Sequence, residues 1–372
     1  MSIGGYEILA IVGFLFAAYA VIANDSIQTL GTFLASNSHR PWWLLWIFAA
    51  GIMVVALLTN QFGLQLSNYF EAQGMGALAG FFGGFDGGLA DGKLNGIPYP
   101  EDGIKWYHAL PPIVLLFLTR FGIPVSTTFL VLTVFAFTGG AATEGKMEQM
   151  LIKSLTGYAV AFAAGAVIWL LVSRLWETWV GRTDHDEHRH PMWSVFQWLT
   201  TGFLWFTWLQ QDFANIFVFM PREAVLAADG SVQMMVFSPF VVVAGAIIMA
   251  MMMAYVFATR GGEIQQIVLS KTNTIDVRSA TIVDLIYAIV LYYFKELNNV
   301  PMSTTWVFLG LLAGRELAIS FVTDLRTRGA AAFDVGTDAF RAFIGLIISI
   351  VLAVGMPWAA TGQLPNFFGL GG

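Results

Sequence analysis

The stretches Pro124-Val125-Ser126-Thr127-Thr128 and Pro301-Met302-Ser303-Thr304-Thr305 repeat one pattern within this chain. Their first residues, 124 and 301, are 177 positions apart, which is close to half of the 372 residues. A second pair of positions has a similar spacing, because Asp25 and Asp212 each lie near the end of a long apolar segment. Two matching pairs at similar offsets indicate that the chain contains two copies of one structural unit.

An interrupted pair of apolar segments surrounds each copy of the pattern. The pairs are His108–Phe121 with Ser126–Phe137, and Thr281–Phe294 with Thr304–Ala313. Each segment is shorter than the ~20 residues that a helix needs to cross a bilayer. Paired short segments at corresponding positions are typical of a transporter binding site. Two ordinary helices joined by a tight turn are the alternative, and we expect a broken helical hairpin in each half.

The composition is typical of a membrane protein. Hydrophobic residues make up 57% of the chain and charged residues 11%, less than half of the charged share of soluble domains. The chain has no cysteine and no basic stripe, which excludes a disulfide-stapled domain and argues against a nucleic-acid partner. We predict an all-α polytopic protein in the lipid bilayer. Its expected spanning segments are Tyr6–Ala23, Pro41–Thr59, Leu155–Val172, Trp193–Val218, Met235–Ala258 and Ala342–Ala360.

The two units are expected to be inverted-topology repeats, residues 1–176 and 193–372, joined by a polar linker over residues 177–192. Each unit has three crossings and a hairpin that returns to its own side, so the second unit must have the opposite orientation. Lys and Arg are more numerous on the side opposite to the termini. Because these residues gather in cytoplasmic loops, we expect both termini outside the cytoplasm, in an inner or plasma membrane.

An aspartate at position 212 is energetically unfavourable. Apolar sequence lies on both sides of it, and a charge at membrane depth costs at least ~2.5 kcal/mol. No Lys or Arg lies within four residues along the chain, so a cation from solution is the natural partner. Carboxylate and amide oxygens suit Na⁺, and H⁺ is the alternative. The sequence predicts a cation site at Asp212 and at Asp25, although Asp25 alone would be an ordinary polar helix end.

Each Ser-Thr-Thr run stands where a helix is expected to begin. The first N–H groups of a helix are unpaired and its dipole is positive there, which favours an anion. N-capping by the serine is the alternative, and both roles are compatible. We predict that the hydroxyls and N–H groups of both runs bind a tetrahedral oxyanion without an arginine. The candidate residues are Ser126, Thr127, Thr128, Ser303, Thr304 and Thr305.

These motifs resemble the signatures of the inorganic phosphate transporter (PiT) family, which includes sodium–phosphate symporters, proton-coupled phosphate carriers and sulfate permeases. That family carries a duplicated Pro-x-Ser-Thr-Thr signature and a duplicated Gly-Ala-Asn-Asp-x-Ala-Asn signature. The second signature is matched here by Ala23-Asn24-Asp25-Ser26-Ile27-Gln28 and Gln211-Asp212-Phe213-Ala214-Asn215. Gln28 and Gln211 stand where the family has Asn, which keeps the amide but moves its oxygen. The resemblance implies cation binding by Asn24, Asp25, Gln28, Gln211, Asp212 and Asn215.

Residues and resemblance together predict a secondary active transporter, not an enzyme, that carries inorganic phosphate with Na⁺ by alternating access. Sulfate or another oxyanion is the alternative cargo, and H⁺ is the alternative coupling ion. An anion channel would be a different class of protein, distinguished by conduction without a coupling ion. We expect the aromatic residues between Trp193 and Trp208 to face outward, which favours a homodimer.

Overall fold

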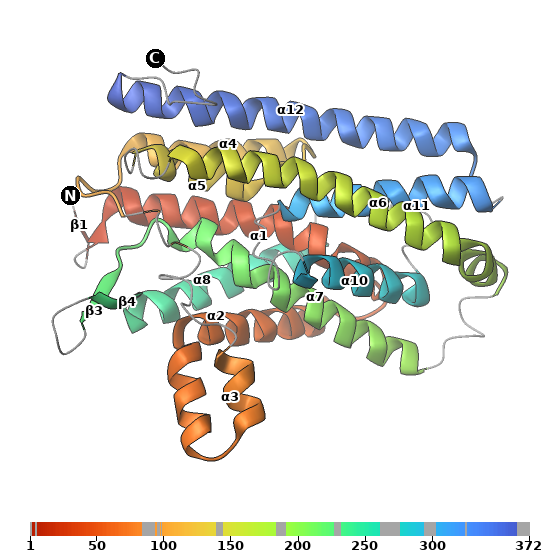
Figure 1. Ribbon diagram of the computed structural model, residues 1–372, viewed down its shortest axis with the longest axis horizontal. Coiled ribbons are helices and arrows are strands. Elements are labelled where there is room, and N and C mark those ends of the chain that lie inside the picture. Colours follow the sequence, from red (N-terminus) through yellow and green to blue (C-terminus); the bar gives the residue numbers. More distant parts are fainter. Residues whose placement is uncertain are drawn as a thin grey trace.

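The computed structural model describes residues 2–3, 6–83, 94, 97, 99–138, 144–183, 191–226, 232–260, 276–293, 303–323 and 326–362. Most of these residues are helical, and the long helices lie side by side along one axis (Figure 1). Two short antiparallel strand pairs are also present: β1 (Ser2–Ile3) with β2 (Tyr6–Glu7), and β3 (Glu223–Leu226) with β4 (Val232–Val236). The helices are α1 Ile8–Ser36, α2 Trp42–Ala72, α3 Gly76–Gly83, α4 Trp106–Arg120, α5 Thr127–Thr138, α6 Glu144–Arg182, α7 Pro191–Phe217, α8 Pro239–Ala258, α10 Val277–Leu291, α11 Thr304–Val322 and α12 Arg328–Thr361.

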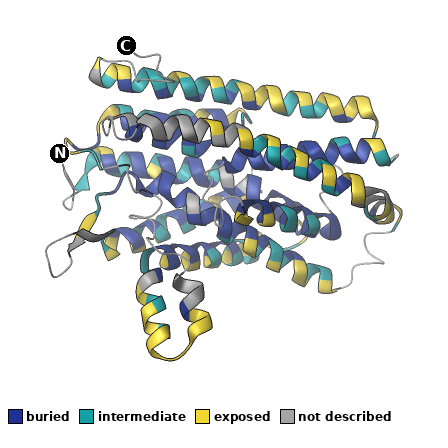
Figure 2. Ribbon diagram, in the orientation of Figure 1, coloured by how far each residue is buried: buried dark blue, intermediate teal, exposed yellow. Residues whose placement is uncertain are grey.

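Several helices are suited to cross a membrane. Within the described residues, four are long and apolar enough by length and composition, and the bent α1 would be a fifth. The centre of the bundle is buried, whereas large apolar side chains such as Phe240 and Val351 are exposed on the outside (Figure 2). An apolar exterior around a buried core is what lipid requires of a spanning protein. The chain is therefore an all-α polytopic membrane protein, as predicted.

The first helix is longer than the sequence indicates, and it is bent. The prediction ended it at Ala23, but α1 continues to Ser36 and changes direction by 48° between Ile8–Asn24 and Gln28–Ser36. At the bend, the Ser26 hydroxyl donates to the carbonyl of Ile22. Such back-bonding of a serine bends helices. The polar residues after Ala23 thus mark a bend inside the membrane bundle and not the end of the helix.

Both predicted hairpins are present, and they enter the bundle from opposite ends (Figure 1). The first consists of α4 and α5, and the second of α10 and α11. The tips of the two hairpins meet, because the Thr305 hydroxyl at the start of α11 donates to the Val125 carbonyl just before α5, at 2.8 Å. The broken segments therefore bring the two Ser-Thr-Thr runs to one place.

The helices that precede the hairpins run antiparallel between the two halves. Phe14 packs against Phe217 at 5.5 Å between ring centroids, and Phe33 packs against Trp198 at 5.2 Å. The start of α1 therefore lies beside the end of α7, and the end of α1 lies beside the start of α7. Inverted repeats require this arrangement. The division into repeats 1–176 and 193–372 with a linker over residues 177–192 stays a prediction.

Backbone contact holds α6 against α11. A Cβ atom built on Gly314 would lie 2.3 Å from the carbonyl oxygen of Phe162, and one built on Gly165 would lie 2.6 Å from that of Leu311. Gly310 and Gly314 form a Gly-x-x-x-Gly pattern, which allows membrane helices to approach closely. The second hairpin is thus fixed to the last helix of the first half through glycines.

The aromatic residues expected to face outward on α7 divide between the surface and the interior: Phe196 and Phe203 are exposed, whereas Trp205 and Trp208 are buried. Trp205 is fully buried and its Nε1 donates to the Ala49 carbonyl at 3.0 Å. Its ring stacks on Trp208, which is also buried. The expectation is therefore wrong for Trp205 and Trp208, because α7 uses them to pack inside the bundle. A homodimer stays an untested prediction.

Candidate functional site

The centre of the candidate site is a carboxylate–amide pair on α7. The Asp212 side chain is 0% exposed, and the Nδ2 atom of Asn215 donates to its Oδ1 atom at 2.8 Å. The two residues are three positions apart, so they share one face of the helix. The amide therefore holds the carboxylate in a fixed direction, toward the hairpins.

The first Ser-Thr-Thr run binds directly to this pair. Asn215 Nδ2 also lies 3.1 Å from the Thr128 hydroxyl and 3.2 Å from the Thr127 hydroxyl. The Thr128 hydroxyl makes a longer contact of 3.5 Å with Asp212 Oδ1. Thr127 is buried, whereas Thr128 is half-buried. The second copy of the Asp signature and the first copy of the Ser-Thr-Thr signature thus form one polar cluster.

Both serines cap their helices, as the simpler alternative predicted. Ser126 Oγ accepts from the backbone N–H of Phe129 at 3.3 Å, and Ser303 Oγ accepts from that of Trp306 at 3.4 Å. The helices α5 and α11 therefore both begin at the hairpin tips in the middle of the bundle. Their positive dipole ends are directed toward the same region. Capping leaves the other N–H groups and the threonine hydroxyls for further partners.

The second Ser-Thr-Thr run completes the cluster. Ser303, Thr304 and Thr305 are buried, and Thr305 bonds to the Val125 carbonyl as described above. The Tyr287 hydroxyl of α10 donates to the Thr304 carbonyl at 3.0 Å. The structure therefore brings together eight of the twelve predicted site residues: Ser126, Thr127, Thr128, Asp212, Asn215, Ser303, Thr304 and Thr305.

The remaining predicted residues lie on α1, apart from Gln211 on α7. Asn24 and Gln28 are buried on either side of the bend. Within the described part of the chain, neither polar atom of the Gln28 amide has a hydrogen-bond partner. A buried polar group without a partner is rare and calls for a bound ion or water. The side chains of Asp25 and Gln211 lie outside the described residues, as do Pro301 and Met302.

Aromatic side chains fill the bundle between this cluster and the end where α1 begins. Phe14 packs edge-on against Phe217, and Phe135 of α5 packs against Phe219 at 5.0 Å. All four rings are buried. Within the described residues, these four rings form an apolar layer between the cluster and that end.

Sequence reasoning missed a buried carboxylate on α10. Asp284 of α10 is 1% exposed, and it accepts hydrogen bonds from Thr32 of α1 and Thr201 of α7. The signal was present in the sequence, because Asp284 is the one acidic residue within the apolar segment Thr281–Phe294. An intramembrane acidic residue marks a functional site by default.

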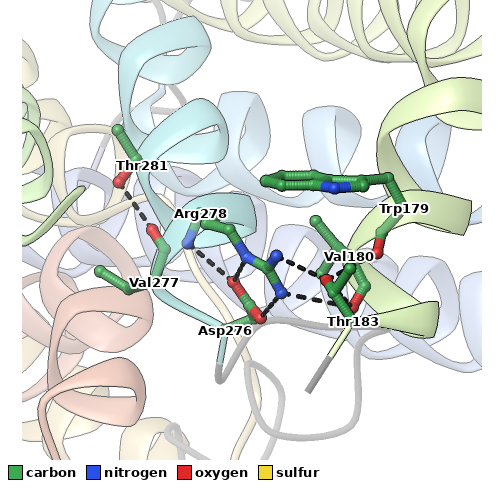
Figure 3. A network of polar contacts seen from close by, with 7 residues as sticks. All are labelled: Trp179, Val180, Thr183, Asp276, Val277, Arg278 and Thr281. Carbon is green, nitrogen blue, oxygen red and sulfur yellow. Dashed lines mark hydrogen bonds and ion pairs between the residues drawn. The ribbon is translucent and has the colours of Figure 1, made fainter. Parts of the chain in front are cut away.

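A buried arginine clamps the end of α6 to the start of α10 (Figure 3). The Arg278 guanidinium binds Asp276 at 2.6 Å, the Thr183 hydroxyl at 2.7 Å and the Val180 carbonyl at 3.3 Å. It also lies 4.4 Å from the ring centroid of Trp179. The planar guanidinium can satisfy these partners together, whereas an ammonium cannot. The clamp therefore ties the second hairpin to the end of α6, which extends to Arg182 and so into the predicted linker over residues 177–192.

Replacing Arg278 by lysine is expected to destabilise the protein by about 1–3 kcal/mol, since an ammonium keeps the charge but leaves some of these buried acceptors without a donor. The thermal unfolding midpoint of the purified protein should fall. Arg328→Lys is the matched control, because Arg328 is exposed and lies 4.9 Å from the ring centroid of Phe321. Equal unfolding midpoints for the two variants would show that the clamp does not contribute to stability.

Comparison with known proteins gives one relevant likeness. The chain is similar in structure to a protein described as "The sodium-dependent phosphate transporter", with a TM-score of 0.54 and 14% sequence identity. The aligned region covers 96% of this chain and 98% of that one. No protein-family model and no curated protein sequence matches the chain. A likeness at 14% identity shows a shared fold. At the level of the fold, it confirms the resemblance that the motifs indicated.

Proposed function

We propose that this chain is a secondary transporter that carries inorganic phosphate across a membrane together with Na⁺. The observation that carries the proposal is the junction of Asp212 and Asn215 with both Ser-Thr-Thr runs in one buried cluster. The solved protein with the same fold is a sodium-dependent phosphate transporter, which supports the same cargo here.

The two helix starts suit a phosphate anion. Helices α5 and α11 direct their positive ends and their first N–H groups toward one region, which favours an oxyanion. The Thr127 and Thr128 hydroxyls accept from the Asn215 amide and can still donate to a tetrahedral anion, whereas the Thr305 hydroxyl donates to the Val125 carbonyl. Within the described residues, no Lys or Arg side chain hydrogen-bonds to either run. A site without a fixed positive charge can release its anion, which transport requires.

Oxygen atoms on α7 and at the bend of α1 suit Na⁺. Asp212 supplies a carboxylate, and within the described residues the Oδ1 atom of Asn215 and the Gln28 amide have no hydrogen-bond partner. Asp25 stands at the bend of α1, where interrupted backbone favours ion binding. Cations at these residues would neutralise the phosphate dianion and lower the cost of enclosing it in the bundle.

Alternating access is the expected mode of movement. The hairpins enter from opposite ends and meet at their tips, so each can open the cluster to its own side (Figure 1). Phe14, Phe135, Phe217 and Phe219 form a buried aromatic layer on one side of the cluster, and we expect this layer to close that side. Movement of one unit against the other would exchange the open side for the closed one.

Uptake of radiolabelled phosphate into proteoliposomes tests the proposal. An inward Na⁺ gradient should drive accumulation of phosphate, whereas an equal K⁺ gradient should not. Excess sulfate should compete only weakly. Strong competition by sulfate would move the assignment to another oxyanion, and an H⁺ gradient acting alone would change the coupling ion. Anion current without any coupling ion would instead identify a channel.

Removal of one hydroxyl tests the substrate site. Thr128→Val should raise the KM for phosphate about tenfold, since one lost hydrogen bond to a charged ligand costs about 1.4 kcal/mol. Thr133→Val is the control on the same helix, because the Thr133 hydroxyl bonds only to the Phe129 carbonyl of its own helix among the described contacts. A KM that is unchanged in Thr128→Val would remove this threonine from the phosphate site.

A further inference from the structure

Asp284 lies apart from the cluster at the hairpin tips. It is the eighth residue of the fifteen-residue helix α10, and the eighth residue of the fifteen-residue helix α4 is Ile113. The first hairpin therefore has no carboxylate at the corresponding position. This charge is a feature of one half only, and the duplicated motifs do not explain it.

The surroundings of Asp284 are polar but carry no cationic partner. The Thr201 hydroxyl donates to one carboxyl oxygen at 2.5 Å, and the Thr32 hydroxyl donates to the other. Within the described part of the chain, no Lys or Arg side chain forms an ion pair with Asp284. Burying a carboxylate without a compensating charge is so costly that such groups bind a positive charge or take up a proton.

The charged groups on the neighbouring elements are engaged elsewhere. The elements packed against α10 are α1, α6, α7 and α11. Arg278 of α10 binds Asp276, and Arg315 of α11 binds Glu316. Asp25 and Asp212 belong to the proposed cation site, and Arg182 of α6 is exposed. The side chains of Glu144, Lys146, Glu148, Lys153, Arg174 and Glu177 on α6 lie outside the described residues.

A proton fits this geometry better than a metal ion. The two threonines bind different oxygens of one carboxyl group, and a hard metal cation needs about six oxygen ligands. Within the described residues, no group of three or more acidic, His or Cys side chains could hold a metal. A protonated carboxyl needs only one acceptor for its hydrogen, and a threonine hydroxyl can both accept and donate.

We propose that Asp284 is a proton-binding site whose carboxyl group is neutral in the described conformation. Further polar side chains lie between Thr32 and the end of α1, but their hydrogen bonds end at the Thr32 backbone carbonyl and not at the hydroxyl that binds Asp284. The Ser36 hydroxyl donates to the Thr32 carbonyl at 2.8 Å, and the Gln197 amide bonds to both Ser36 and Asn37. Arg40, which is half-buried, bonds to the Asn37 side chain at 3.0 Å.

The proton site is linked to the proposed phosphate site through α10. Tyr287 lies three residues after Asp284 and donates to the Thr304 carbonyl at the start of α11. Loss of the proton would leave a buried negative charge, which is stabilised by hydration. Entry of water would separate α10 from α1 and α7. This link to transport depends on the proposed function, whereas the binding of a proton does not.

Infrared difference spectroscopy between acidic and alkaline buffers tests the site without any transported substrate. The purified protein should show the C=O stretching band of a protonated carboxyl group, and Asp284→Asn should lose it. Asp212→Asn should keep the band. In Thr201→Val the band should remain and move to a higher frequency, because one hydrogen bond to the carboxyl group is lost. A band unchanged in Asp284→Asn would overturn the proposal.

Two further arms separate the alternatives. If Na⁺ at constant pH removes the band while K⁺ does not, a metal cation and not a proton is the partner of Asp284, and the proposal is wrong. The second arm measures phosphate uptake into proteoliposomes as a function of pH. Because asparagine imitates the neutral acid, the ratio of uptake by Asp284→Asn to uptake by the wild type should be near one at acidic pH and should fall at alkaline pH. The ratio cancels the titration of phosphate itself. A ratio independent of pH would contradict the link to transport, and absent phosphate uptake in the wild type would contradict the proposed function alone.

Discussion

Asp212→Asn is expected to lower Na⁺-driven phosphate uptake about 100-fold or more, a loss of about 2.7 kcal/mol in binding terms. The substitution keeps the shape of the side chain and removes its negative charge. The Asn215 amide that now donates to Asp212 Oδ1 at 2.8 Å would keep an acceptor, so the fold should be preserved. What disappears is the charge that attracts the coupling cation into the buried cluster.

The measurement is the initial rate of uptake as a function of Na⁺ concentration. Asp338→Asn on α12 is the control, because this half-buried aspartate belongs to none of the predicted sites. Asp212→Glu should keep part of the activity, since it retains the charge but displaces the oxygens by one methylene. Wild-type rates in Asp212→Asn at every Na⁺ concentration would exclude this carboxylate from cation binding.

The motifs predicted the caps and the helix starts of the candidate site because each motif fixes a local structure. A serine before a helix is a cap, and a pair of short apolar segments around it is a hairpin. Ser126 and Ser303 are caps in the structure, and the helices begin at Thr127 and Thr304 as the pattern indicates. Local chemistry of this kind can be interpreted without a structure, since the partners are only three residues apart.

Contacts between distant residues could not be predicted in the same way. Nothing in the sequence states that Thr305 bonds to the Val125 carbonyl, 180 positions away, because that contact depends on how the two hairpins approach. The bend of α1 was missed because a polar residue after an apolar run also ends a helix. Trp205 was placed outside because an aromatic residue suits a lipid surface as well as a helix interface.

The glycines of α11 are a signal that the sequence did carry. Gly310 and Gly314 have the spacing of a close helix contact, and the structure places them against the backbone of α6. A Cβ atom on Gly314 would lie 2.3 Å from the Phe162 carbonyl oxygen and 2.7 Å from the Ala166 nitrogen. Both are backbone atoms, so relief requires the two helices to move apart. That movement would displace the helix that begins at Thr304.

Gly314→Ala is therefore expected to destabilise the protein, and Gly314→Val to prevent it from folding. In an unconstrained helix, replacing Gly by Ala stabilises by about 0.5–1 kcal/mol, so the expected sign is the reverse of the intrinsic preference. Gly51→Ala on α2 is the control, because Gly51 is exposed and a Cβ atom there meets nothing within 4 Å.

Two measurements in detergent test this prediction. Thermal unfolding gives the midpoint of each variant, and size-exclusion chromatography gives the fraction of monodisperse protein. The midpoint should rise or stay constant for Gly51→Ala and fall for Gly314→Ala, while Gly314→Val should yield aggregated protein. The same displacement should weaken phosphate transport in any Gly314→Ala protein that survives, because Thr304 and Thr305 move with α11. A Gly314→Ala variant as stable as Gly51→Ala would mean that α6 and α11 are not in backbone contact, and the placement of the second Ser-Thr-Thr run would lose its support.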